Sequence, residues 1–240
     1  MLAAFGWGAL GASALLVGAV IAYQFHPNRR IIAFVMALGT GLLIGSVAFE
    51  LVDDALDAQS VGAVGALMLV GAVVFVAGDW FLDRQGAGDR KDPTGEQASG
   101  SPLAIVLGSI LDGIPESFVL GLTVLQGGVS VAFLVSVLLS NLPEGMSSSS
   151  GLDAAGWPRK RVLLMWLAVI VVSALSAALG WLLLDPASGR TGALVQAFAG
   201  GALLAMVADT LLPEAYETEG PFTGLVVVVG FAISVSLSAV

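Results

Sequence analysis

Apolar stretches run through almost the whole chain and are separated by short breaks that contain charged residues, proline or glycine. Each stretch is close to the ~20 residues that an α-helix needs to cross the hydrocarbon core of a bilayer. The pattern predicts eight transmembrane helices, at Leu2–Gln24, Ile31–Val52, Val61–Leu82, Pro102–Leu125, Val129–Leu152, Val162–Leu184, Thr191–Leu212 and Pro221–Ala239. We therefore expect an all-α integral membrane protein in which residues 1–240 form a single transmembrane domain.

The composition supports this interpretation and excludes several other classes. Hydrophobic residues make up 57% of the chain and charged residues only 11%, whereas soluble domains carry about 25% charged residues. The chain has no cysteine, which excludes a disulfide scaffold, a thiolate zinc site and a cysteine nucleophile. The formal net charge of -9 argues against a nucleic-acid partner. The lipid bilayer is the expected partner.

The basic residues predict an orientation. Eight of the nine lie in the first, third and fifth predicted loops, and only Arg190 lies on the other side. Because cytoplasmic loops carry the excess of Lys and Arg, we expect those loops on the cytoplasmic side of the cell (plasma) membrane and both termini outside the cell. The third loop, residues 84–101, is the one long connection. Its Gly, Ser and charged residues predict a mobile cytoplasmic loop.

An internal repeat is visible in the sequence. A shift of 160 positions aligns residues 37–55 with residues 197–215 without a gap, and seven positions are identical. The two segments lie on predicted helices that cross in opposite directions, which is typical of an inverted-repeat transporter fold. We therefore expect two inverted three-helix repeats around a central helix pair, with the repeats at residues 1–83 and 161–240 and the pair at residues 102–152.

No Lys, Arg or His lies inside any predicted span, although Arg161 borders the sixth, whereas six acids lie inside the spans or near their ends. These acids are Glu50, Asp79, Asp112, Glu116, Glu144 and Asp209. A charge at the bilayer centre costs at least ~2.5 kcal/mol, and buried ions are normally paired or bound to metal. We expect protons or a cation to neutralise these carboxyl groups. Asp79, near the inner end of its helix, is instead expected to reach cytoplasmic water.

The central helices hold the densest group of polar side chains. Asp112 and Glu116 are four residues apart and share a helix face, as do Ser140 and Glu144, with Asn141 beside them. The helices are antiparallel, so both groups are expected near the membrane midplane. Their oxygens could enclose a divalent cation, because carboxylate and amide oxygens suit hard metal ions. In the alternative interpretation, protonated carboxyls simply hydrogen-bond to a neighbouring helix.

Each of the two central glutamates follows a proline. Pro115 and Pro143 each remove a backbone N–H, so we expect broken helical backbone that faces protein or a water-filled cavity. Ser147–Ser150 follow the second of these segments. We expect these small residues to permit close helix approach rather than to line a pathway.

At these residues the chain resembles the ZIP family of divalent metal-ion transporters. Residues 141–145 (Asn-Leu-Pro-Glu-Gly) match that family's fifth-helix motif closely, and residues 112–116 (Asp-Gly-Ile-Pro-Glu) match its fourth-helix pattern His-Asn-x-Pro-Glu with two changes. Residues 211–215 look like the family's seventh-helix ending, and residues 50–54 look like its second-helix counterpart. The resemblance implies eight helices with both termini outside, transport of a divalent transition metal, and a homodimer.

Carried over by position, the resemblance implies that Glu116 and Glu144 are central metal ligands. Asp112 stands where the family usually has His, Gly113 where it usually has Asn, and Ser140 where it often has His or Gln. Loss of imidazole reduces the expected preference for zinc, so the choice among zinc, iron, manganese or a similar metal stays open. Acids at the helix ends are the expected entrance and exit residues, namely Glu50, Asp54, Asp209 and Glu214.

The predicted function is therefore transport of divalent metal cations through the site on the fourth and fifth helices. The metal is the substrate, and we expect neither a resident cofactor nor enzymatic activity. Other hypotheses stay open: movement of another solute or of protons by the same carboxyls, and a non-transporting metal sensor or assembly subunit. An intramembrane aspartyl protease would use Asp112 and Asp209, but the chain has no paired catalytic-aspartate signature with suitable flanks.

Overall fold

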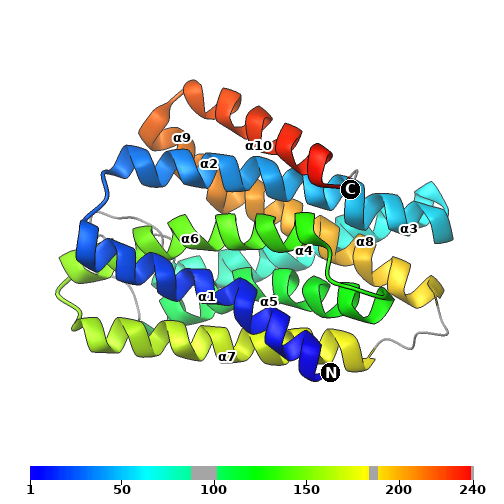
Figure 1. Cartoon of the computed structure of the whole chain (residues 1–240), viewed down its shortest axis with the longest axis horizontal. Coiled ribbons are helices and arrows are strands. Elements are labelled where there is room, and N and C mark those ends of the chain that lie inside the picture. Colours follow the sequence, from blue (N-terminus) through cyan, green and yellow to red (C-terminus); the bar gives the residue numbers. More distant parts are fainter. Residues whose placement is uncertain (88–101, 184–188, 239–240) are drawn as a thin grey trace.

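The computed structural model describes residues 1–87, 102–183 and 189–238. Within these ranges every regular element is a helix, and most of the helices run along the long axis of the molecule (Figure 1). In chain order the elements are α1 Leu2–Phe25, α2 Arg29–Ser46, η1 Val47–Val52, α3 Asp53–Ala58, α4 Val61–Leu82, η2 Asp83–Ala87, α5 Pro102–Gln126, α6 Val131–Ala154, α7 Arg159–Leu183, α8 Gly189–Met206, η4 Val207–Leu211, α9 Leu212–Glu219 and α10 Phe222–Ser238, where η marks a π-helical segment.

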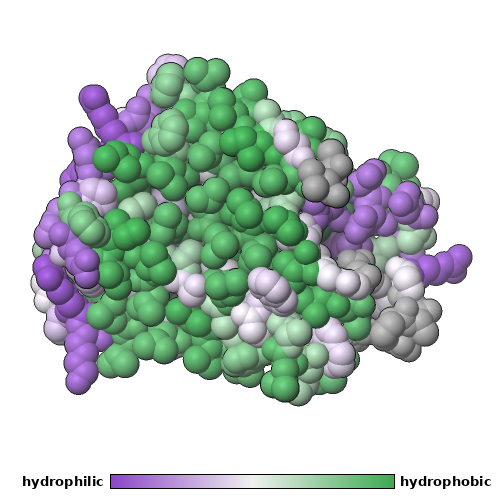
Figure 2. Space-filling view, in the orientation of Figure 1, coloured by the Kyte–Doolittle hydropathy of each residue, from purple (hydrophilic) through white to green (hydrophobic). Residues whose placement is uncertain are grey.

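The helices have the length and polarity of membrane spans. In the described part of the chain, seven helices of 23 to 31 residues are long and apolar enough to cross a bilayer, and α10 adds a shorter apolar helix of 17 residues. Figure 2 shows hydrophobic side chains over the middle of one face and hydrophilic side chains at its two ends. The chain is a multi-pass membrane protein. Its first helix begins, and α10 ends, on the side opposite the α1–α2 connection (Figure 1).

The predicted second and seventh spans ended too early. The helix that starts with α2 continues through η1 and α3 to Ala58, and the helix that starts with α8 continues through η4 and α9 to Glu219. Acidic residues do not stop these helices, because a helix end that emerges from the bilayer can expose them to water. Asp53 and Asp57 of α3 are exposed in this way.

The predicted loop at 84–101 also begins later than expected. Arg84 to Ala87 belong to the π-helical segment η2, and residues 88–101 lie outside the described residues. The helix continues because the N–H of Asp83 still bonds to carbonyls of the preceding turn, and because the Arg84 guanidinium lies 3.7 Å from the ring centre of Trp80. Gly86, at φ 95, has the left-handed conformation that glycine adopts without strain.

Two π-helical segments begin at corresponding positions. η1 begins at Val47 and η4 begins at Val207, and these residues are separated by the same 160 positions that align the two sequence segments. Each segment carries one acid, Glu50 in η1 and Asp209 in η4. π-helical turns occur frequently at functional sites. The hydrophobic pattern alone did not predict either of them.

Pro115 and Pro143 lie inside continuous helices, so the prediction of broken backbone beside them was wrong. A proline removes one backbone hydrogen bond and bends the helix without ending it when neighbouring groups stabilise the altered turn. Beside Pro115, the carbonyl of Ile114 accepts a hydrogen bond of 3.2 Å from the hydroxyl of Ser176 on α7. This bond joins α5 to α7 beside the proline, whereas the carbonyl that loses its helical donor is that of Leu111.

Glycines allow two helix pairs, α2–α10 and α4–α8, to approach backbone to backbone. A Cβ atom on any of four glycines would overlap a carbonyl oxygen of the facing helix. The glycines and the residues whose carbonyls they face are Gly41 with Val227, Gly230 with Leu38, Gly201 with Met68 and Gly71 with Phe198. The two interfaces match residue by residue. Gly41 and Leu38 of α2 correspond to Gly201 and Phe198 of α8, 160 positions later, and Met68 and Gly71 of α4 correspond to Val227 and Gly230 of α10, 159 positions later. The two interfaces are packed in the same way.

A second set of glycines joins α1 to α6 and α5 to α7. The glycines and the facing carbonyls are Gly18 with Leu142, Gly145 with Leu15, Gly180 with Phe118 and Gly121 with Ala177. These two interfaces also match. Leu15 and Gly18 of α1 correspond to Ala177 and Gly180 of α7, 162 positions later, and Phe118 and Gly121 of α5 correspond to Leu142 and Gly145 of α6, 24 positions later. Close approach through small residues is a common way for membrane helices to pack, since lipid supplies little hydrophobic driving force between them.

Candidate functional site

The five central residues predicted from the sequence are all buried, and they lie on α5 and α6. Each exposes only 1–4% of its surface: Asp112, Glu116, Ser140, Asn141 and Glu144. The Ser140 hydroxyl donates a hydrogen bond of 3.1 Å to Oε1 of Glu116, which links the two helices directly. The Asn141 amide donates to the carbonyl of Gly11 on α1, at 3.3 Å. The structure therefore brings these residues to the interior of the bundle rather than to its lipid-facing surface.

Helical spacing explains why each helix presents a polar face. On α6, Ser136, Ser140, Glu144 and Ser147 follow one another at intervals of four, four and three residues, so they form one stripe along the helix. On α5, Ser109, Asp112 and Glu116 do the same at intervals of three and four residues. All seven residues are buried. Between residues 102 and 152 the sequence has no Lys, Arg or His.

The carboxyl groups do not form a complete metal site by themselves. In the described part of the chain, no group of three or more His, Cys, Asp or Glu side chains is arranged so that it could hold a metal ion. A cation at this site would need hydroxyl, amide or backbone oxygens in addition to carboxylates. Ser140 and Asn141 offer the first two kinds of oxygen, and the metal-ligand set stays a prediction.

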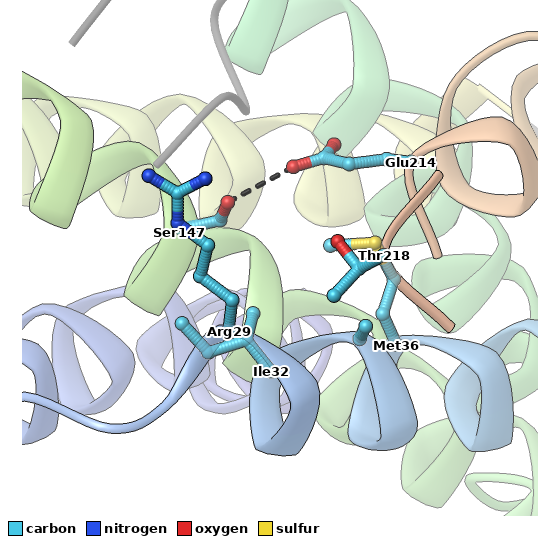
Figure 3. A pocket seen from close by; sticks show the side chains of 7 residues that line it. Arg29, Ile32, Met36, Ser147, Glu214 and Thr218 are labelled. Atoms are coloured by element: carbon cyan, nitrogen blue, oxygen red, sulfur yellow. Dashed lines mark hydrogen bonds between the residues drawn. The ribbon is translucent and has the colours of Figure 1, made fainter. Parts of the chain in front are cut away.

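The C-terminal end of the α6 stripe reaches Glu214, one of the predicted exit residues. The Ser147 hydroxyl donates a hydrogen bond of 2.9 Å to Oε1 of Glu214 on α9. Both side chains line a small pocket together with Arg29, Ile32, Ala33, Met36 and Thr218 (Figure 3). Ser147 therefore lines a pocket, whereas we expected close helix approach to be its main role. Sequence reasoning also missed Arg29, because nothing local indicates that the start of α2 lies beside α9.

The N-terminal end of the α6 stripe meets a cluster of three serines that the sequence alone did not indicate. The hydroxyl of Ser46 on α2 lies 2.7 Å from that of Ser136 on α6 and 3.1 Å from that of Ser234 on α10. All three side chains are fully buried. Their residue type was visible in the sequence, but only the packing of three helices shows that they meet.

The predicted entrance acids lie in η1 and α3, and each has a hydrogen-bond partner. Glu50 accepts from the Ser238 hydroxyl at 3.0 Å, and Asp54 accepts from the Gln196 amide at 3.1 Å. Asp54 is exposed and Glu50 is partly buried. The carboxylates can therefore face water at this end while helices α8 and α10 hold them in place.

Asp209 and Asp79 differ from the other acids. Asp209 is exposed in η4 and is not among the residues that line the pocket with Glu214. Asp79 was expected to reach cytoplasmic water, but that prediction was wrong, since only 4% of its surface is exposed. The helix continues past Asp79 into η2, so the side chain does not lie at a helix end. The adjacent Gly78 faces Leu111 of α5, which shows how closely α4 and α5 approach here.

Several buried hydroxyls near the polar stripes have no hydrogen-bond partner within the described residues. They include Ser109 on α5, Ser148 on α6 and Thr40 on α2. Such groups normally bond to protein or ordered water.

No family model matches this chain, and a search of curated proteins finds no match either.

Proposed function

We propose that this protein moves divalent metal cations across a membrane through a site formed by α5 and α6. The observation that carries the proposal is the burial of three carboxyl groups, those of Asp112, Glu116 and Glu144, on these two helices together with the oxygens of Ser140 and Asn141. Ionised carboxyls away from water need a proton, a metal or a basic partner. A cation that passes through the site would supply that charge transiently, which is what transport requires.

The chemistry of the donors favours a hard or borderline cation. Carboxylate, amide and hydroxyl oxygens suit Mn(II) and Mg(II), and Fe(II) and Zn(II) also bind carboxylates. No thiol exists in the chain, and its single histidine, His26, lies at the end of α1. These features support manganese or iron before zinc. The resemblance of residues 112–116 and 141–145 to the ZIP motifs gives the same reaction class.

We propose further that the fold is an inverted repeat in which α1, α2 and α4 correspond to α7, α8 and α10. The alignment at 160 positions supports this, as do the π-helical segments that begin at Val47 and Val207. The glycine interfaces support it most directly, because the four helix pairs repeat with constant offsets. In such folds the substrate site lies near the midplane, between the repeats.

The orientation follows from the basic residues and belongs to the same proposal. With the predicted first and fifth loops in the cytoplasm, the pocket at Ser147 and Glu214 opens inward, and Glu50 and Asp54 face outward. The three buried serines then close the path on the outside of the site. A cation would reach the site past the outer acids and leave past Glu214. The plasma membrane is the proposed location.

The test is metal flux in proteoliposomes. Purified protein would be reconstituted and uptake of Mn(II), Fe(II) and Zn(II) followed with a trapped indicator. We expect Glu116→Gln and Glu144→Gln to lower uptake about tenfold or more, because even groups that only support a metal ligand change affinity by 10–100-fold. Glu217→Gln is the matched control, since Glu217 is an exposed acid outside the site. Unchanged flux in both site variants would overturn the proposal.

A second function is favoured by one observation. Because no three acidic side chains are grouped as a metal site among the described residues, the carboxyls could carry protons that drive another solute. Vesicles free of divalent metal, with a trapped pH indicator and an imposed pH gradient, separate the two functions. Proton flux that persists under chelation and disappears in Glu116→Gln would favour this second function over metal transport.

A further inference from the structure

Three basic residues open α7, and the charge of the helix itself does not favour them there. Arg159, Lys160 and Arg161 are all exposed, and the first turn of α7 carries no acidic residue. Because the N-terminus of a helix has a partial positive charge, basic side chains at this end are unfavourable for the folded chain alone. An anion beside them would remove that disadvantage.

The connection that carries these bases is short and held by a backbone hydrogen bond. α6 ends at Ala154, and Gly156, at φ 82, has the left-handed conformation that glycine adopts without strain. The N–H of Trp157 then bonds to the carbonyl of Leu152 at 2.9 Å, and α7 begins at Arg159. The bases therefore extend from a fixed backbone.

The three bases point to different sides of α7, because successive residues of a helix are ~100° apart. Arg159 faces the protein: its guanidinium lies 4.9 Å from the ring centre of Tyr23 on α1, and its Nε lies 3.5 Å from Oδ1 of Asp153 on α6. The Arg161 guanidinium instead lies 4.2 Å from the ring centre of Trp157. Arg159 thus has an acidic partner within the chain, and the next two bases face another side of the helix.

Lys160 and Arg161 lie at the head of an apolar stripe along α7. Exposed apolar side chains follow them at intervals of three or four residues, which places these side chains on one face of the helix: Leu164, Leu167, Val171, Leu175, Leu179 and Leu182. At 1.5 Å per residue the stripe is about 27 Å long, close to the ~30 Å of the hydrocarbon core. α7 lies along one edge of the bundle (Figure 1). This face therefore meets lipid, and the two bases lie at the level of the headgroups.

A second pair of adjacent bases, Arg29 and Arg30 at the start of α2, lacks such a stripe. Both side chains are exposed, but no residue between Phe34 and Phe49 is exposed. The α2 pair therefore has no continuous lipid-facing surface behind it. It provides a comparison within the chain, with equal charge and a similar place at the start of a helix.

We propose that Lys160 and Arg161 bind the phosphate of an anionic phospholipid whose acyl chains lie along the apolar stripe of α7. Charge complementarity favours the anionic headgroup, since Lys and Arg form strong charge-assisted hydrogen bonds with phosphate. The stripe favours a lipid over a soluble phosphate. Trp157, partly buried beside Arg161, is an aromatic residue of the kind enriched at membrane interfaces. The inference does not depend on metal transport, because it concerns the surface of the bundle.

Native mass spectrometry of the purified protein in detergent tests the proposal, with phosphatidylglycerol and phosphatidylcholine of the same acyl chains as probes. We expect the parent chain to bind phosphatidylglycerol more tightly than phosphatidylcholine. Lys160→Gln with Arg161→Gln should weaken phosphatidylglycerol binding about tenfold or more and remove the preference, because each base near an anionic lipid contributes about fivefold. Lys160→Arg with Arg161→Lys keeps both charges and should retain the preference.

Arg29→Gln with Arg30→Gln is the matched control, because it removes two adjacent exposed bases and should leave the preference unchanged. Phosphatidylglycerol should also raise the unfolding temperature of the parent chain and of this control, but not that of Lys160→Gln with Arg161→Gln, since a ligand of the folded state stabilises it. Equal losses of binding in the two double variants would refute a local lipid site.

Two other occupants of this surface would also overturn the proposal. Glycerol phosphate has the anionic group without acyl chains, so its displacement of the bound lipid at equal concentration would mean that the bases take a soluble anion. A second copy of the chain on the stripe would appear as a dimer that dissociates in Lys160→Gln with Arg161→Gln while the number of lipids bound to each protomer stays the same.

Discussion

Ser140 on α6 donates its hydroxyl to Glu116 on α5, and these two residues are separated by the same 24 positions as the packing glycines Gly121 and Gly145. Under the proposed inverted repeat, positions 24 apart on α5 and α6 are exchanged by the pseudo-two-fold axis. Two exchanged residues that touch must lie on that axis, so the Ser140–Glu116 contact marks the centre of the repeat.

The same relationship means that Glu116 and Glu144 are not equivalent positions in the proposed repeat. The sequence motifs Pro115-Glu116 and Pro143-Glu144 align at 28 positions, one helical turn more than the 24 positions at which the helices pack. Glu116 is therefore matched by Ser140 rather than by Glu144. The two carboxylates have different surroundings, and we expect them to have different roles in binding a cation.

Removal of the central hydroxyl is the first prediction. Ser140→Ala takes the hydrogen-bond donor from a buried carboxylate, and such bonds to charged groups contribute about 1.5–3 kcal/mol. We expect metal uptake in proteoliposomes to fall about tenfold, with the larger change in the half-saturating metal concentration, because Glu116 is no longer held for the cation. Ser236→Ala, at an exposed serine that bonds only within α10, should behave like the parent chain. Equal uptake in the two variants would contradict this role for Ser140.

The glycine interfaces give the second prediction. A side chain at Gly41 would overlap the backbone of α10 at Val227, and backbone yields less readily than a side chain. We expect Gly41→Leu to lower the unfolding temperature in detergent by several degrees or to prevent a monodisperse preparation, since overpacking alone costs about 1–3 kcal/mol. Gly65→Leu is the control, because an added Cβ there meets nothing within 4 Å. Equal unfolding temperatures would mean that α2 and α10 can separate at little cost.

The sequence predicted the helices well, because a membrane span needs a long apolar run and little else. It did not predict where the second and seventh helices end, since acidic residues such as Asp53 and Asp57 are compatible with a helix that has left the bilayer. It predicted that Pro115 would break the backbone. The prediction was wrong because a proline inside a helix can remove one hydrogen bond without ending the helix.

The sequence likewise predicted one part of the candidate site and missed another. Spacing along one helix put Asp112 with Glu116 and Ser140 with Glu144, because helix periodicity is a local property. The cluster of Ser46, Ser136 and Ser234 depends on three helices that meet only in the folded chain. The sequence did not predict the position of Arg29 for the same reason, because Arg29 lines a pocket with residues of other helices. Contacts between distant segments are set by packing, which a single sequence does not reveal.

Orientation in the membrane is the third prediction, and the lack of cysteine makes it simple to measure. A single cysteine at exposed Asp57 should react with a membrane-impermeant maleimide in intact cells, and one at exposed Glu217 should react only after permeabilisation. Ser46→Cys should react in neither condition, because Ser46 is fully buried. Labelling of Asp57→Cys only after permeabilisation, and of Glu217→Cys in intact cells, would reverse the proposed orientation.

The fourth prediction concerns the acids at the outer end of the second helix. Asp53, Asp54 and Asp57 are exposed on α3, so they raise the local concentration of cations without holding one tightly. Replacing all three by Asn should raise the half-saturating metal concentration about threefold at low salt, while the maximal rate stays the same. The difference should shrink in ~0.5 M salt, because exposed charges are screened over a few ångströms at high ionic strength. Glu217→Gln with Glu219→Gln, which removes two acids at the opposite end of the bundle, is the control and should leave uptake from the outer side unchanged. A lower maximal rate with an unchanged half-saturating concentration would mean that these acids act in the transport step and not in collecting the cation.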